Sequence, residues 1–188
     1  MGRIKTVSDE AVLNGLLGAM EALGPGGLSF SKASAAVGLS SATLVQRFRN
    51  RDAMVEAVLM HAWDRLDALT LTADNEFPLT PDGAIALLLH LMPAGAAEYN
   101  FTDGLLLLRE DLRSPALRAR GAAWGQYLAD ALGRRLTFEG EATEQLGWQM
   151  LAMWQGGAIW WAFRRDRDPE TAIRAVLEQW CRSVGIIV

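Results

Sequence analysis

Few residues of this chain have the types and spacing that catalysis or metal binding requires. The 188 residues include one cysteine, Cys181, and two histidines, His61 and His90. One cysteine can form no intrachain disulfide, and a zinc site, which needs several Cys or His side chains, is not expected. The sequence also contains no nucleophile elbow and no phosphate-binding glycine loop behind a strand. These features favour a binding protein over an enzyme and predict no metal and no cofactor.

The residues best suited to bind a partner lie between residues 28 and 54. Leu44 and Phe48 are four residues apart and share the inward face of a short helix, so polar and small side chains occupy its other face. The amide of Gln46 can pair with adenine, and hydroxyl or guanidinium groups can bind phosphates. A solvated polar face is the other interpretation, and these residues alone do not decide between the two. The candidates for DNA contact are Ser31, Ser41, Ala42, Thr43, Val45, Gln46, Arg47 and Arg51.

Charge is distributed unevenly along the chain. Residues 1–51 carry six basic and three acidic side chains, whereas the other 137 residues carry 12 basic and 19 acidic ones, for a net charge of −4. A basic segment next to an acidic body indicates that one end of the protein meets a polyanion. Chance is the alternative explanation, because the N-terminal excess is only three charges.

Helical spacing of apolar residues extends through the whole sequence, and no segment alternates as a strand would. Ser8 is suited to cap the first helix, the glycine-rich stretch at 24–27 ends it, and Gly38 provides a left-handed turn. The sequence therefore predicts an all-α fold of about nine helices. Their expected ranges are about 9–23, 31–37, 41–48, 51–72, 81–92, 103–112, 115–132, 141–165 and 169–184.

The segment around the short helices resembles the DNA-binding domain of TetR-family transcriptional regulators. The family signature Gly-Val-Ser-x-x-Thr-Leu-Tyr-x-x-Phe is matched at Gly38, Ser40, Thr43, Leu44 and Phe48. Leu39 replaces the usual valine, Val45 replaces a tyrosine that contacts phosphate, and Ser41 replaces a lysine. Val45 can instead touch a thymine methyl group. The match covers roughly residues 8–70, and the remainder agrees only in length and helix order.

The resemblance implies a three-helix helix-turn-helix DNA-binding domain over residues 1–51 and a helical effector-binding and dimerisation domain over residues 52–188. It implies a cytoplasmic homodimer, a repressor that leaves a palindromic double-stranded DNA operator when a small effector binds. Two alternatives stay open: a helical enzyme or small-molecule carrier whose N-terminal helices are scaffold, and a membrane-anchored protein. Residues 145–163 carry no charge, but the glutamines and glycines inside this span favour a buried helix and no membrane.

Aromatic residues gather in the second half of the chain, where six of the seven tryptophans follow residue 120. Such side chains line ligand pockets, dominate obligate interfaces and fill ordinary cores. The pattern alone does not distinguish among these three roles. By the family resemblance, a pocket for a small apolar, uncharged effector would be lined by Trp63, Leu87, His90, Leu108, Trp124, Tyr127, Met150 and Trp154. The last two helices would form the dimer interface through Gly156, Gly157, Trp160, Leu177 and Trp180.

Overall fold

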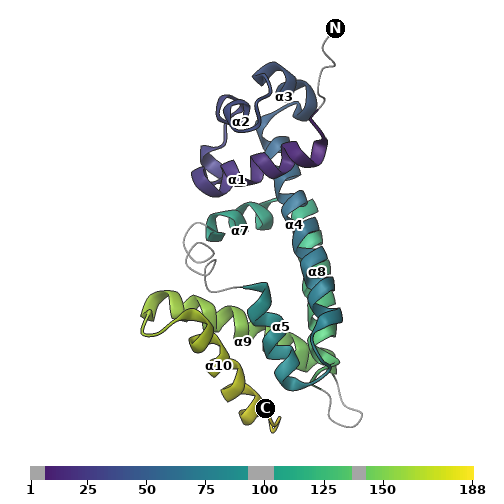
Figure 1. Cartoon of the computed structure of the whole chain (residues 1–188), viewed down its shortest axis with the longest axis vertical. Helices are drawn as coiled ribbons and strands as arrows, with labels where there is room; N and C mark the ends of the chain where they lie inside the picture. Colours follow the sequence, from purple (N-terminus) through teal and green to yellow (C-terminus); the bar gives the residue numbers. More distant parts are fainter. Residues whose placement is uncertain (1–6, 93–103, 137–142) are drawn as a thin grey trace. The chain divides into compact units, whose positions relative to one another are not determined.

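The computed structural model describes residues 7–92, 104–136 and 143–188, and these ranges form nine helices with no strand (Figure 1). The helices are α1 (Asp9–Gly27), α2 (Phe30–Val37), α3 (Ser41–Phe48), α4 (Arg51–Glu76), α5 (Pro81–Leu91), α7 (Gly104–Arg113), α8 (Pro115–Gly133), α9 (Thr143–Arg164) and α10 (Pro169–Ser183). The predicted all-α fold is confirmed. Within the described ranges, no helix combines the length and the apolar character that crossing a membrane requires.

The packing divides the chain into two compact units. The first unit comprises Met1–Arg65 and Asp103–Arg120, and the second comprises Leu66–Thr102 and Gly121–Val188. α4 and α8 therefore each contribute residues to both units. The predicted boundary between residues 51 and 52 divides the chain by function rather than by packing, and it stays a prediction.

In the first unit, α1 to α4 enclose one apolar core. Side chains without exposed surface in this core are Leu16, Met20, Leu44, Met54 and Val58. The hydroxyls of Ser8, Ser29 and Ser40 each accept the backbone N–H three residues further on, which starts α1, α2 and α3. Gly24 has a non-helical conformation (φ 69°, ψ 161°) that ends the regular part of α1, as the sequence predicts. The short helices thus have defined starts and a common core.

α4 ends later than the sequence predicts. The apolar spacing predicts an end near residue 72 and a break over 73–80, but the helix continues to Glu76. Ala73 is fully buried, and the carbonyls of Asp74 and Phe77 accept hydrogen bonds from Arg135. The last carbonyls of a helix have no partner within it, so these external donors stabilise a turn that extends beyond the apolar stripe.

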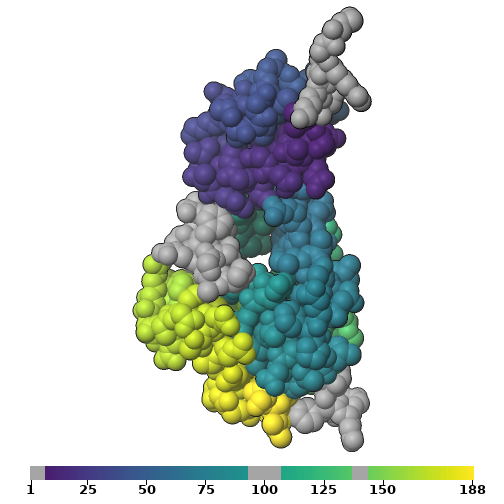
Figure 2. Space-filling view, viewed as in Figure 1, coloured from purple at the N-terminus to yellow at the C-terminus, as the bar shows by residue number. Residues whose placement is uncertain are grey.

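In the second unit, α5 contributes to the core, and α9 packs against α10. Ala84, Ile85, Leu87 and Leu88 of α5 have no exposed surface. Figure 2 shows α9 and α10, coloured green to yellow, side by side at the surface. The turn between them is closed by Trp161, whose Nε1 donates to the Arg167 carbonyl at 2.9 Å. These contacts hold the last two helices together as a hairpin.

Candidate functional site

α2 and α3 are joined by a tight turn. Gly38 adopts the left-handed conformation (φ 69°, ψ 18°), which glycine reaches without strain. Its backbone N–H donates to the Ser34 carbonyl at 3.0 Å, and the Ser34 hydroxyl donates to the Leu39 carbonyl at 2.6 Å. Ser40 then caps α3, because its Oγ accepts the Thr43 N–H at 3.1 Å. The turn between the two short helices therefore has the geometry that the sequence predicts.

α3 has one buried and one exposed face. Leu44 has no exposed surface, and Phe48, one turn later, packs against the same core. Val45, between them, is 43% exposed. Ser41 is half-buried, and its hydroxyl donates to the Phe30 carbonyl at 3.3 Å, which ties the start of α3 to α2. The other predicted contact residues on α2 and α3 are exposed: Ser31, Ala42, Thr43, Gln46 and Arg47.

Two exposed basic residues lie on this surface in addition to the predicted ones. Lys32 follows Ser31 in the first turn of α2, and Arg49 follows the last residue of α3. Neither was among the eight candidates for DNA contact, and the signal that could have found Lys32 is its charge next to a candidate. Both increase the positive charge that the surface presents.

Arg47 forms an ion pair with Asp9 at the start of α1. Its Nη2 lies 2.8 Å from Asp9 Oδ1, and the Asp9 side chain is 84% exposed. Exposed ion pairs stabilise a protein by about 0–1 kcal/mol. A phosphate could therefore replace Asp9 as the partner of Arg47 at small cost, and Arg47 keeps its suitability for DNA contact.

Arg51 has a different environment from Arg47. Its Nε donates to the Leu28 carbonyl at 3.0 Å, and its Nη2 donates to the Pro25 carbonyl. A further ion pair joins its Nη1 to Asp52 Oδ1 at 3.3 Å. The guanidinium thus holds the start of α4 against the end of α1 and the residue that follows it, so its observed contacts are those of a positioning residue.

The eight candidate effector-binding residues are divided between the two units. Trp63 and Leu108 belong to the first unit, and the other six belong to the second. Trp63 Nε1 donates to Asp111 Oδ1 at 3.1 Å. Burial raises the pKa of Asp111 above its ordinary value, although the hydrogen bond from Trp63 acts in the opposite direction. Leu108 is 48% exposed.

Four of the six candidates in the second unit are buried. Leu87 of α5 and Met150 of α9 have no exposed surface. Trp124 is 8% exposed, and its Nε1 donates to the Thr70 hydroxyl at 2.9 Å. Trp154 is 7% exposed, and its Nε1 is the one buried side-chain polar atom among the described residues that has no hydrogen-bond partner. An unsatisfied buried donor costs about 1–3 kcal/mol, so a bound acceptor at this position would be favoured.

The two predicted polar anchors of an effector, Tyr127 and His90, are both exposed. The Tyr127 hydroxyl donates to Asp74 Oδ2 at 2.9 Å, so its proton already has an acceptor. The His90 ring packs edge-on against Phe77, with ring centroids 5.5 Å apart. Their observed contacts are with the neighbouring protein surface.

The candidate dimer residues face two directions. Trp160 is 65% exposed, and a Cβ added at Gly156 would meet no atom within 4 Å. A Cβ at Gly157 would lie 3.2 Å from Val176 Cγ1, so Gly157 faces α10 of the same chain. Leu177 and Trp180 are buried. Gly156 and Trp160 are therefore available to a second subunit, whereas the other three residues contribute to the packing of α9 on α10.

An open groove of ≈ 630 Å³ lies along α9 and α10. Its lining combines apolar and polar side chains, including Met153, Arg164, Arg167, Val176, Gln179 and Trp180. None of the eight candidate effector-binding residues lines it. The groove borders the candidate dimer surface through Trp180 and is a different place from the predicted effector pocket.

Cys181, the one cysteine of the sequence, is a buried free thiol. The described residues contain no group of three or more His, Cys, Asp or Glu side chains that could hold a metal ion. Burial raises the pKa of the Cys181 thiol to about 11, so this side chain is a neutral thiol at physiological pH.

Comparison with known proteins finds similarity in structure only. No family model matches the sequence, and no curated protein matches it. A crystal structure assigned to the TetR family of transcriptional regulators, from Rhodococcus sp., has a TM-score of 0.66 and 21% identity, over 91% of this chain and 95% of that one. A TetR transcriptional regulator from Legionella pneumophila has a TM-score of 0.67 and 16% identity, over 95% and 99%. The regulator FadR from Bacillus subtilis, in complex with stearoyl-CoA, has a TM-score of 0.58 and 15% identity, over 91% and 96%. The chain shares the all-α fold of these proteins.

Proposed function

We propose that this chain is a TetR-family transcriptional regulator, a cytoplasmic repressor that binds a palindromic operator in double-stranded DNA as a homodimer and is released by a small apolar effector. The observation that carries the proposal is the exposed face of α3. A short helix set by a left-handed turn at Gly38 presents small and polar side chains outward while Leu44 holds it on the core. The shared fold supports this interpretation.

In this proposal α3 enters the major groove. Ala42 and Val45 are apolar and exposed, and they suit thymine methyl groups, whereas the amide of Gln46 suits the N6 and N7 of adenine. Thr43 and Arg47 would bind phosphates, which fix the register of the helix without reading the sequence. Lys32 and Arg49 would add to this electrostatic attraction. Arg51 would keep α4 in place beneath the short helices.

The homodimer is proposed because a palindrome presents two half-sites about 34–36 Å apart. Trp160 and Gly156 lie on the exposed side of α9, and this helix carries further exposed apolar side chains. They include Met153, Ile159 and Phe163. Apolar exposure of this extent on one helix suits an interface between subunits.

The effector is proposed to bind among the buried candidates of the second unit. Leu87, Trp124, Met150 and Trp154 are each buried, and Trp154 Nε1 is a donor without a partner. A small, uncharged, largely apolar molecule with one hydrogen-bond acceptor matches this set. Binding would need to favour a dimer conformation whose α3 helices miss the two half-sites, through a coupling free energy of about 1–3 kcal/mol.

The test is capture of DNA fragments from the source genome by the full-length protein, followed by fluorescence anisotropy on the captured duplex. We expect one palindromic sequence to be enriched. Gln46→Ala should relax the preference for that sequence over a duplex with one adenine changed, by about tenfold, since one bidentate base contact contributes about 1–3 kcal/mol. Gln145→Ala, which changes an exposed glutamine on α9, is the matched control and should leave the preference unaltered. Capture of no specific fragment would contradict the proposed function.

A further inference from the structure

The chain makes a sharp turn at Arg49, between α3 and α4. Arg49 has φ 69° and ψ −54°, and the N–H of Asn50 donates to the Phe48 carbonyl at 2.8 Å. This is a γ-turn of the rarer form, in which the central residue has a positive φ and is strained. Glycine adopts a positive φ without a steric penalty, whereas a residue with a Cβ does not. An arginine therefore occupies a position that glycine would fill at lower cost.

The helices on both sides of the turn are held by the core of the first unit. Phe48 at the end of α3 and Met54 in the first turn of α4 pack into that core. The Asn50 side chain starts α4, because its Oδ1 accepts the Ala53 N–H at 2.8 Å. Only Arg49 and Asn50 lie between the two helices, so the short connection imposes the turn. The connection does not require an arginine.

The Arg49 side chain is exposed, and no hydrogen bond or ion pair joins it to any residue that the structure describes. The arginines two positions before and after it both have partners. Arg47 pairs with Asp9, and Arg51 donates to two backbone carbonyls. Of these three neighbouring arginines, Arg49 is the one whose guanidinium is free to bind a ligand within the described part of the chain.

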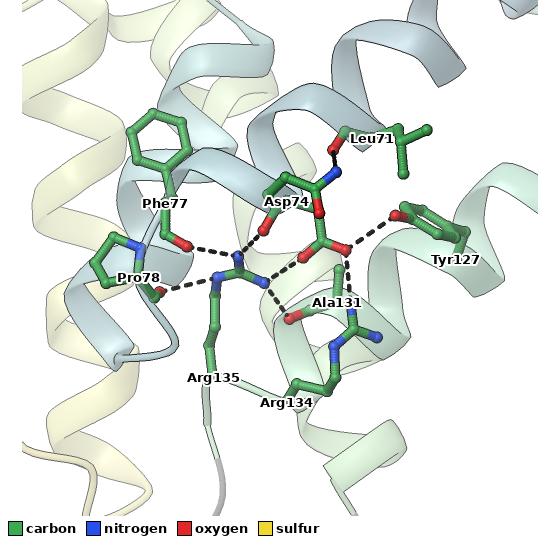
Figure 3. Close-up of polar contacts among 9 residues, drawn as sticks. Leu71, Asp74, Phe77, Pro78, Tyr127, Ala131, Arg134 and Arg135 are labelled. Atoms are coloured by element: carbon green, nitrogen blue, oxygen red, sulfur yellow. Dashed lines mark hydrogen bonds and ion pairs between the residues drawn. The ribbon is translucent and has the colours of Figure 1, made fainter.

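Arg135, in the second unit, shows how this chain uses an arginine to hold its fold (Figure 3). The Arg135 side chain has no exposed surface. Its acceptors, at 2.6–3.1 Å, are Asp74 Oδ1 and the carbonyls of Asp74, Phe77, Pro78 and Ala131. Arg49 differs in both respects, because it is exposed and makes no such bond. Stabilisation of the fold therefore does not explain an arginine on the strained turn.

Arg49 lies at the end of the exposed face of α3. Its backbone N–H donates to the Val45 carbonyl at 2.7 Å, as in a helix, so Arg49 lies one turn beyond Val45. The eight residues of α3 extend about 12 Å, and the major groove of DNA is about 12 Å wide. In the proposed complex the first turns of α3 contact base edges. Its last residue then lies near the phosphates that border the groove.

We propose that Arg49 binds one defined phosphate in each half-site and that the strained turn holds its side chain there; this inference rests on the proposed function. The turn fixes the backbone from which the guanidinium extends, so less conformational freedom is lost on binding. A guanidinium can bind two phosphate oxygens at once with fixed geometry, which the ammonium of lysine does not match. Arg49 thereby fixes the register of α3, beyond the general attraction that any positive charge on this surface exerts.

The experiment is a double-mutant cycle between Arg49 and single phosphates of the captured palindrome. Each duplex carries one neutral methylphosphonate per half-site, at each position in turn, and fluorescence anisotropy gives its dissociation constant. We expect one position at which this change weakens wild type at least fivefold and Arg49→Ala less than twofold. At the other positions, wild type and Arg49→Ala should lose affinity by the same factor. Arg49→Lys takes the place of Arg49→Ala if the latter does not fold.

Two further variants separate the side chain of Arg49 from its backbone. Arg49→Lys keeps the charge, so the salt dependence of binding should stay as in wild type while the affinity falls at least threefold. Arg49→Gly relieves the turn and should melt about 2–4 °C above Arg49→Ala. It should nevertheless bind the palindrome no better than Arg49→Ala. Arg174→Ala, which removes an arginine that pairs with Glu170 on α10, is the matched control and should bind as wild type does.

The outcomes distinguish this inference from the proposed function. If wild type binds the palindrome and no phosphate position distinguishes it from Arg49→Ala, the inference fails while the proposed function stands. Wild-type affinity in Arg49→Lys or in Arg49→Gly would overturn it as well, because neither variant has the guanidinium. If wild type captures no specific fragment, the proposed function fails, and the role of Arg49 fails with it.

Discussion

Two adjacent glycines of α9 allow the proposed dimer to be tested separately from folding. Gly156 has open space around it, whereas a Cβ at Gly157 would lie 3.2 Å from Val176 Cγ1 of the same chain. An arginine at position 156 would therefore leave the packing of α9 on α10 unchanged and would even replace a poor helix former, worth about 1 kcal/mol. It would place a charge in the proposed apolar interface. We expect Gly156→Arg to keep the wild-type helical circular dichroism and to dimerise at least 100-fold more weakly.

Gly157→Arg should instead destabilise the fold of the single chain. Its side chain must displace Val176 and separate two packed helices, which costs about 1–3 kcal/mol. For a chain of this length that corresponds to a fall in Tm of about 3–10 °C. Sedimentation over a range of concentrations and thermal melts followed by circular dichroism measure both effects. A Gly156→Arg variant that remains dimeric at every concentration, or a wild-type protein that is monomeric at micromolar concentration, would refute the reasoning.

Three further outcomes are expected. Arg51→Met should lower the free energy of unfolding by about 1–3 kcal/mol, because the backbone carbonyls of Pro25 and Leu28 lose their donor. Denaturant titration measures this free energy, and an unchanged value would contradict the positioning role of Arg51. Asp111→Asn should raise stability at neutral pH, because the raised pKa of Asp111 shows that its ionisation opposes folding, while an amide oxygen still accepts from Trp63. The wild-type protein should recover that difference as the pH falls through the folded and then the unfolded pKa of Asp111, and a gain that persists in acid would contradict the assignment. Gly147→Ala should reduce helical content or soluble yield, since its Cβ would overlap the Ala129 carbonyl oxygen; a variant as stable as wild type would show that α8 and α9 can separate there.

The helix-turn-helix could be predicted because its determinants are local. A serine three residues before the N–H that it caps, a glycine at a left-handed turn, and Leu44 and Phe48 four residues apart all act within one or two turns of helix. The same local rules placed the starts of α5 and α10 at a proline that follows a capping residue, Thr80 and Asp168. Fold class and helix order follow from such signals.

The contacts that could not be predicted join residues far apart in the sequence. Asp74 and Arg135 are 61 residues apart in the sequence. Two arginines directly after a helix indicate a favourable interaction with the negative end of the helix dipole, and the sequence does not show that one of them is buried and hydrogen-bonded. For the same reason the end of α4 was placed a turn too early. The two sides of α9 are apolar alike, so the pattern did not show that Gly156 faces outward and Gly157 faces α10.

The most direct measurement of the central claim is the salt dependence of operator binding by the wild-type dimer. If two copies of the surface formed by α2 and α3 neutralise about eight phosphates, the logarithm of the affinity should fall against the logarithm of salt concentration with a slope of about −7. Arg47→Gln removes one phosphate contact from each subunit and should bring the slope to about −5. Arg174→Gln, which removes an arginine that pairs with Glu170 on α10, should leave the slope unchanged. A slope near zero, or one that Arg47→Gln does not alter, would contradict the claim that this surface binds DNA.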